Sequence, residues 1–192
     1  VVIGAGVAGL YQLYRLRELG LRVRTFEAGS GVGGTWYWNR YPGARFDSES
    51  WTYGYSFSQA LLEEWDWEEH FAAQPETERY LNYVADKFDL RRDIQFRSRV
   101  TAAHYQEGTR RWDVIVEDGR RYTTRLLMTA IGVLSAATMP TIPKSTNFIS
   151  FPDFYNPRRG SLTGGTNCKN QALSSEKCLA ARSICFSELA IS

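Results

Sequence analysis

A glycine-rich turn near the start of the chain carries the clearest chemical signal in the sequence. Gly4, Gly6 and Gly9 follow the apolar run Val1–Ile3 and precede apolar residues at helical spacing. In such a turn the first glycine permits a tight bend, the second lets the backbone approach a pyrophosphate, and the third lets the helix pack against the strand. The N–H groups at the start of the helix then bind the phosphates. The spacing therefore predicts a dinucleotide site.

An acidic residue completes this signal. The segment Leu21–Phe26 alternates apolar and polar residues as a second strand. Glu27 stands at its end, close to the expected spacing of about 20 residues from the glycines. Its carboxylate is expected to accept hydrogen bonds from ribose hydroxyls and to repel a 2′-phosphate, so this site should not hold NADP. FAD and NAD fit equally, because both contain ADP. The alternative is a glycine-rich turn of an unrelated α/β fold with Glu27 merely solvated.

The segment that follows is dense in aromatic residues. Five of the six tryptophans lie within it, namely Trp36, Trp38, Trp51, Trp65 and Trp67. Aromatic faces can form a wall against a flat ring system such as a flavin, and they can equally fill a core. For Trp36 and Tyr37, directly after two glycines, we expect flavin contact. For Trp65 and Trp67, on an expected helix, we expect core packing.

The remaining pattern places these residues on an α/β fold. Residues 59–88 carry an apolar stripe at helical spacing, interrupted at Pro75. From Asp93 the period changes to two, with two glycine-containing turns, which predicts a small antiparallel meander. A further apolar strand runs from Leu126 to Ile131 and ends at Gly132. We therefore expect a Rossmann-like domain with a partial parallel sheet, a helical insert and a β-meander.

Composition limits the classes of partner. The net charge of +2 is spread along the chain, so nothing predicts nucleic acid or an acidic membrane surface as a partner. No apolar run approaches the ~18 residues that span a bilayer. His70 and His104 lie far apart and the three cysteines follow no metal-binding spacing, so no metal is expected. A cytoplasmic, reducing setting fits these cysteines best. Because the chain opens without Met on a very short strand, we expect a piece of a longer protein.

Three runs of residues identify a family. The runs Gly31–Asp47, Tyr53–Phe57 and Thr129–Ser135 resemble the corresponding segments of Baeyer–Villiger-type (class B) flavin-containing monooxygenases. The resemblance covers residues 1–143, which it implies are the N-terminal FAD-binding domain of such an enzyme. Phe46 departs from the family, in which a smaller residue, often Cys, is common. This departure bears on packing beside the flavin, not on FAD binding.

The resemblance also implies which residues surround the cofactors. In the family, Arg45 and Asp47 lie near the reactive ring of the flavin and the nicotinamide, so they are the two candidate catalytic residues. We expect the Asp47 carboxylate to orient the cationic group beside it; the alternative is a surface ion pair. Val100 is expected at the adenine. The full set expected at FAD is Gly4, Gly6, Val7, Gly9, Glu27, Gly33, Gly34, Thr35, Trp36, Tyr37, Trp38, Arg45, Phe46, Asp47, Tyr53, Val100 and Gly132.

The reaction implied by the family uses NADPH to reduce FAD, and then O2 to insert oxygen next to the carbonyl of a small ketone or to oxidise a heteroatom. Residues 133–192 contain no second glycine-rich unit for NADPH and no family fingerprint, so we expect this chain alone to be inactive. Residues 144–192 do not resemble the family and are expected to form a poorly ordered tail or one short helix. Two alternatives remain open: a non-enzymatic FAD-binding remnant, and an FAD- or NAD-dependent dehydrogenase, which the aromatic run after Gly34 disfavours.

Overall fold

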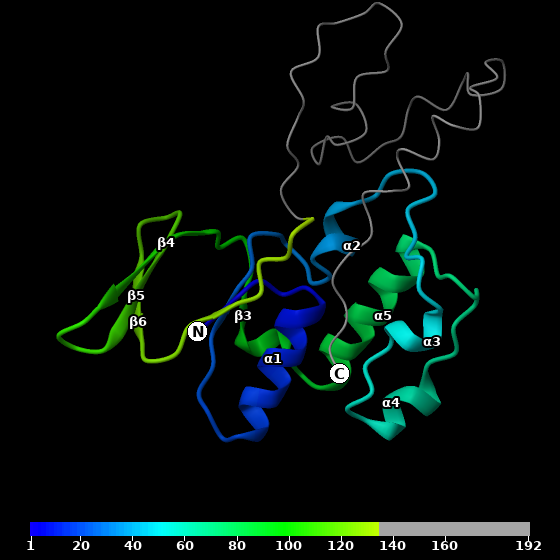
Figure 1. Ribbon diagram of the computed structural model, residues 1–192, viewed down its shortest axis with the longest axis horizontal. Helices are drawn as coiled ribbons and strands as arrows, with labels where there is room; N and C mark the ends of the chain where they lie inside the picture. The colour runs from blue at the N-terminus through cyan, green and yellow to red at the C-terminus, as the bar shows by residue number, and fades with distance from the viewer. Residues whose placement is uncertain (135–192) are drawn as a thin grey trace, which may run out of the picture.

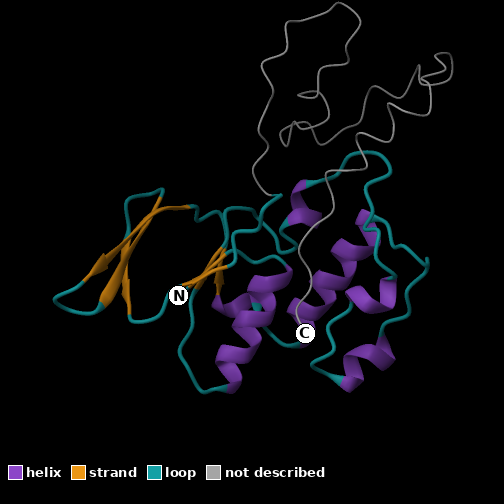
Figure 2. Cartoon of the chain, viewed as in Figure 1, coloured by secondary structure: helices purple, strands orange, loops and turns teal. Residues whose placement is uncertain are grey.

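The computed structural model describes residues 1–134, which Figure 1 draws in colour. Within them, a parallel sheet lies between a group of helices and a separate antiparallel sheet (Figures 1 and 2). This is the α/β class expected from the sequence, with a Rossmann-like sheet, a helical insert and a meander. The expected boundary at residue 143 and the tail at 144–192 lie outside the described residues.

The parallel sheet consists of four short strands in the order β3-β2-β1-β7. Their bounds are Val2–Ile3 for β1, Thr25–Phe26 for β2, Ile94–Gln95 for β3 and Met128–Thr129 for β7. Strand β1 pairs with β2 and β7, and β2 pairs with β3, all in parallel. The strand expected over 126–131 is shorter than its apolar run, because its pairing with β1 spans only β7. The carboxyl ends of the strands meet at one edge, where parallel sheets bind their ligands.

Helix α1 (Val7–Glu18) connects β1 to β2. Leu10 and Leu13 are buried on one side of it, at the helical spacing that the sequence shows. Gly20 follows the helix with a φ of +71°, a conformation that glycine adopts without strain. The strand–turn–helix–strand unit predicted from the glycine spacing is therefore confirmed.

Four short or medium helices and one 3-10 turn form the helical insert between β2 and β3. They are α2 (Thr35–Trp38), α3 (Ser50–Tyr53), α4 (Gln59–Glu64), α5 (Gln74–Lys87) and η1 (Arg91–Asp93). The expectation that Pro75 interrupts a helix is wrong, because Pro75 stands in the first turn of α5. Proline is tolerated there, since the first N–H groups of a helix have no intrahelical partner. The helical stripe is instead broken by the segment between α4 and α5.

An aromatic core ties the insert to α1. Tyr80 on α5 is buried, and its hydroxyl accepts a hydrogen bond from the Tyr55 N–H at 2.7 Å. The Tyr55 hydroxyl in turn donates to Val7 O, in the first turn of α1, at 2.6 Å. The rings of Trp65 and Trp67 pack against that of Tyr80, with centroids 5.2 and 4.9 Å away. Core packing of these two tryptophans is confirmed, although they lie between helices rather than on one.

Burial of Tyr80 makes the stability of the fold sensitive to pH in the alkaline range. Burial raises the pKa of Tyr80 from 10.0 to about 12. The folded state therefore holds this proton more tightly than the unfolded state, so the stabilisation is intact below pH 10 and is lost as pH rises through about 12. We expect Tyr80→Phe to lower stability at neutral pH by about 1–3 kcal/mol, because the Tyr55 N–H loses its acceptor.

The measurement is urea unfolding of both chains at pH 8 and pH 11. The Tyr80→Phe chain should lose less stability between these pH values than the wild type, because one of the buried phenols is gone. Tyr105→Phe is the matched control, since Tyr105 is exposed on the antiparallel sheet. Equal losses of stability in the wild type and in Tyr80→Phe would contradict the raised pKa of Tyr80.

The β-meander is a three-stranded antiparallel sheet in the order β4-β5-β6. Its strands are β4 (Val100–Gln106), β5 (Arg111–Val116) and β6 (Arg121–Thr124). Alternation along β5 buries Val114 and Val116, which pack against Phe26 of β2. The meander expected from the period of two is thus confirmed, and its contact with Phe26 places it against the face of the parallel sheet opposite α1.

Candidate cofactor site

The glycine turn after β1 is closed by backbone contacts that no other residue type permits. Gly4 has a φ of +100°, and a Cβ there would lie 2.3 Å from the carbonyl oxygen of Ala130. A Cβ on Gly9 would lie 1.9 Å from the carbonyl oxygen of Gly4. Gly4 therefore makes the tight bend, and Gly9 lets α1 pack directly on it, as the spacing predicts. The start of α1 consequently lies at the carboxyl edge of the sheet.

Gly34, from the loop after β2, lies directly against Gly6 of this turn. A Cβ on Gly34 would lie 2.8 Å from the α carbon of Gly6, and a Cβ on Gly6 would lie 3.2 Å from that of Gly34. The Gly33 N–H donates to Ala5 O at 3.0 Å, which fixes the two loops together. The approach of a pyrophosphate to Gly6 stays a prediction; what the structure shows is that the side of Gly6 without a side chain accommodates Gly34. Helix α2 begins directly after this crossing of Gly6 and Gly34, with Thr35.

Glu27 is hydrogen-bonded to the backbone of the glycine turn. Its carboxylate is buried, and its two oxygens accept hydrogen bonds from the Ala5 N–H and the Gly29 N–H, both at 2.7 Å. These backbone contacts were not predictable from spacing alone. Each carboxylate oxygen can accept more than one hydrogen bond, and the contact of Glu27 with ribose hydroxyls stays a prediction. The acid, the turn after β1 and the loop after β2 therefore form one hydrogen-bonded unit.

Three of the aromatic residues expected at the flavin are brought together by the fold. Trp36 is buried, and its Nε1–H donates to the Tyr53 hydroxyl at 2.7 Å. The rings of Phe46 and Tyr53 are stacked, with centroids 4.3 Å apart and an interplanar angle of 8°. Trp36 meets Phe46 edge-on at 5.7 Å. This cluster packs into the main core, and its contact with a flavin stays a prediction.

Tyr37 and Trp38, also on α2, do not join that cluster. The Tyr37 ring lies against Gly29 and Gly31, and its hydroxyl is bonded to Ser30. Trp38 meets Tyr37 edge-on at 4.8 Å. The alternation of contacts along α2 thus sends Trp36 into the core and Tyr37 onto the loop that follows β2.

Arg45 and Asp47 do not form the expected pair. Arg45 Nη1 lies 2.8 Å from Glu69 Oε2 and also donates to Phe71 O at 3.1 Å. Asp47 is exposed, and within residues 1–134 no ion pair joins it to Arg45. Glu69, from the segment before α5, is instead the ion-pair partner of Arg45, and an orienting role for Asp47 stays a prediction. Nearness of either residue to a flavin or a nicotinamide stays a prediction.

The two remaining candidates lie at the margins of the site. Val100 begins β4 and is half-buried against the cluster that contains Phe26. Gly132 is exposed with a φ of +68°, two residues beyond Ala130, whose carbonyl abuts Gly4. Their contacts with adenine and flavin are not tested by this geometry.

Comparison with known proteins shows which proteins this chain resembles. A family model described as an NAD(P)-binding Rossmann-like domain matches residues 2–62. The chain is 51% identical over 147 residues to an acetone monooxygenase (methyl acetate-forming) from Gordonia sp. strain TY-5, covering 77% of this chain and 28% of the relative. It is 50% identical over 141 residues to a Baeyer–Villiger monooxygenase from Pseudooceanicola batsensis, covering 73% of this chain and 26% of the relative. Over about three quarters of its length, this chain is thus similar to the N-terminal part of Baeyer–Villiger and related monooxygenases.

A solved structure supports the same relationship. The structure of OTEMO in complex with FAD and NADP superposes with a TM-score of 0.71 at 50% identity, over 74% of this chain and 27% of that one. The chain thus spans about a quarter of the length of the Baeyer–Villiger monooxygenases that it matches. The resemblance read from Gly31–Asp47 and the two shorter runs is confirmed.

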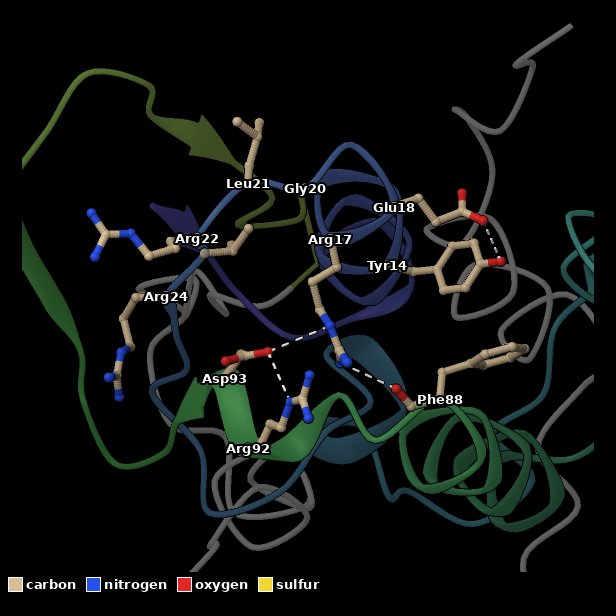
Figure 3. A pocket seen from close by; sticks show the side chains of 11 residues that line it. Tyr14, Arg17, Glu18, Gly20, Leu21, Arg22, Arg24, Phe88, Arg92 and Asp93 are labelled. Atoms are coloured by element: carbon tan, nitrogen blue, oxygen red, sulfur yellow. Dashed lines mark hydrogen bonds and ion pairs between the residues drawn. The ribbon is translucent and has the colours of Figure 1, made fainter.

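A separate hollow lies away from the glycine turn. Figure 3 shows this hollow of about 710 Å³ beside the C-terminal half of α1, lined by Tyr14, Phe88 and several arginines. It contains none of the expected site residues. Arg17 within it is already engaged, since it lies 3.6 Å from Asp93 and donates to Phe88 O. The hollow is therefore distinct from the glycine turn and its acid.

Residues 1–134 contain no cluster of histidine, cysteine, aspartate and glutamate suited to a metal ion. Among these same residues, none of the helices has the length and apolar character needed to cross a bilayer.

Proposed function

We propose that this protein is an NADPH-dependent flavin monooxygenase of the Baeyer–Villiger type, and that the described residues are its FAD-binding part. The observation that carries the proposal is the unit formed by Glu27, the Gly4–Gly9 turn and the crossing at Gly34. It combines a buried acceptor for ribose hydroxyls with backbone N–H groups for a pyrophosphate. Similarity to OTEMO supports FAD as the cofactor of this unit, because the OTEMO structure contains FAD and NADP.

The residues present fit FAD chemically. Glu27 would bind the ribose, and the N–H groups at the start of α1 would bind the pyrophosphate. Trp36, Phe46 and Tyr53 would stand beside the flavin, where their rings exclude water. When bound, FAD supplies the redox chemistry, accepting a hydride from NADPH and activating O2 for insertion next to a carbonyl. The Glu27 carboxylate would repel a 2′-phosphate, so NADPH is expected at another site.

The proposal also includes the substrate class and the cellular location. Relatives named for acetone and cyclohexanone suggest a small ketone as the substrate class. A cytoplasmic location rests on the cysteine spacing discussed above. Inactivity of the 192-residue chain alone stays a prediction.

FAD titration of the purified 192-residue chain tests the proposed function. We expect FAD to quench the tryptophan fluorescence saturably, because Trp36 stands where the flavin is proposed to bind. NAD is the informative competitor, since the matched family model is described as NAD(P)-binding. Saturable binding of NAD with no uptake of FAD would overturn the proposal in favour of a nicotinamide-dependent dehydrogenase. Glu107→Ala, in an exposed turn of the meander, serves as a control variant that should bind FAD like the wild type.

A further inference from the structure

The contacts of Tyr37 lie on the loop that follows β2, at Gly29, Ser30 and Gly31. A Cβ on Gly29 would lie 2.7 Å from one edge of the Tyr37 ring, and a Cβ on Gly31 would lie 3.1 Å from the other. The ring therefore packs closely on this loop, and a side chain at Gly29 would force it to shift. Its hydroxyl accepts from the Ser30 N–H at 3.1 Å and is hydrogen-bonded to Ser30 Oγ at 2.8 Å.

This loop sets the direction of the Glu27 carboxylate. The Gly29 N–H donates to Glu27 Oε1, so a shift of the loop moves one of the two donors that orient the acid. The Arg97 N–H also holds the loop, because it donates to Gly29 O at 2.8 Å. Tyr37 supplies the contacts on the remaining side. Because Tyr37 sits on α2, directly after the Gly34 crossing, it links the pyrophosphate turn to the ribose acid.

We propose that Tyr37 is a positioning residue for the adenosine half of the cofactor, acting through the Gly29–Gly31 loop on Glu27. This inference rests on the proposed function, because it assumes that the site takes FAD. It deepens that function by dividing the residues of α2: Trp36 belongs to the flavin side and Tyr37 to the ribose side.

The test compares Tyr37→Phe with the wild-type chain, using FAD, ADP and FMN as separate probes. The variant keeps the ring against the two glycines and loses only the hydroxyl, so the chain should still fold. We expect the Kd values for FAD and for ADP to rise together by about fivefold to tenfold, the size of one lost hydrogen bond. The Kd for FMN, which lacks the adenosine, should not change.

Two further variants sharpen the result. Ser30→Ala removes one of the two partners of the hydroxyl and should weaken FAD and ADP by a smaller factor in the same pattern. Tyr105→Phe is the matched control on the meander and should change nothing. A rise in the FMN Kd with an unchanged ADP Kd would assign Tyr37 to the flavin and overturn the inference, as would unchanged binding of all three probes. If the wild-type chain bound neither FAD nor ADP, the proposed function itself would fall, and this inference with it.

Discussion

Replacing Gly9 by alanine is expected to lower the stability of the folded chain by about 3 kcal/mol or more, at the upper end of the cost of overpacking. The new Cβ would lie 1.9 Å from the carbonyl oxygen of Gly4 and 2.8 Å from its carbonyl carbon. Neither atom can yield, because Gly4 itself abuts Ala130 and its N–H is bonded to Phe26 O. Alanine favours a helix over glycine by about 1 kcal/mol, which is too little to offset the clash.

Urea unfolding of the purified variant checks this expectation. Gly108→Ala is the matched control, because a Cβ there meets nothing within 4 Å, and its stability should stay within about 0.5 kcal/mol of the wild type. Gly20→Ala adds a second comparison, since its position has a φ of +71° but open space, so it isolates backbone strain from steric clash. A Gly9→Ala chain as stable as the Gly108→Ala chain would mean that α1 does not pack on the glycine turn.

Glu27→Ala is expected to weaken both the fold and the cofactor site. The Ala5 and Gly29 N–H groups would lose their buried acceptor, and each orphaned group costs about 1–3 kcal/mol. We therefore expect a loss of stability of about 2–4 kcal/mol even without FAD. In addition, FAD affinity should fall by about 1–3 kcal/mol, because the hydrogen bonds to the ribose hydroxyls are lost.

Two separate measurements distinguish these effects. Unfolding without ligand reports the structural part, and FAD titration at a temperature where both chains are folded reports the binding part. Glu107→Ala controls for removal of an exposed carboxylate. Loss of stability with unchanged FAD affinity would make Glu27 a structural residue only. Loss of FAD affinity with unchanged stability would contradict the hydrogen bonds to Ala5 and Gly29.

The features that could be predicted from the sequence are those fixed by local backbone geometry. Gly4 and Gly9 reveal the strand–turn–helix unit because the requirement for glycine arises within a few residues. Period-two alternation likewise reveals β5, whose buried residues Val114 and Val116 face the sheet. Pro75 shows the limit of such reasoning, since proline both ends helices and begins them, and only the path of the chain decides.

The contacts that could not be predicted are those set by how distant segments fold back on each other. Arg45 has an acidic neighbour two residues away in Asp47, yet it pairs with Glu69, which the Arg45–Ala73 bridge brings alongside. Tyr37 follows two glycines and so suggests a flavin contact, but the glycines that matter for its ring are Gly29 and Gly31. Spacing indicates which residue types a site of this kind needs, and it leaves their contact partners open.

The crossing of Gly6 and Gly34 has a consequence for protein engineering. Each glycine leaves room for the α carbon of the other. A side chain at Gly6 or at Gly34 would therefore disturb the same contact, and a second substitution at the other glycine would not restore it. A nucleotide-binding module transplanted into another scaffold could therefore not stop at Glu27, where the sequence motif ends. The smallest portable unit runs at least through Gly34, because only then does the graft bring its own counterpart to Gly6.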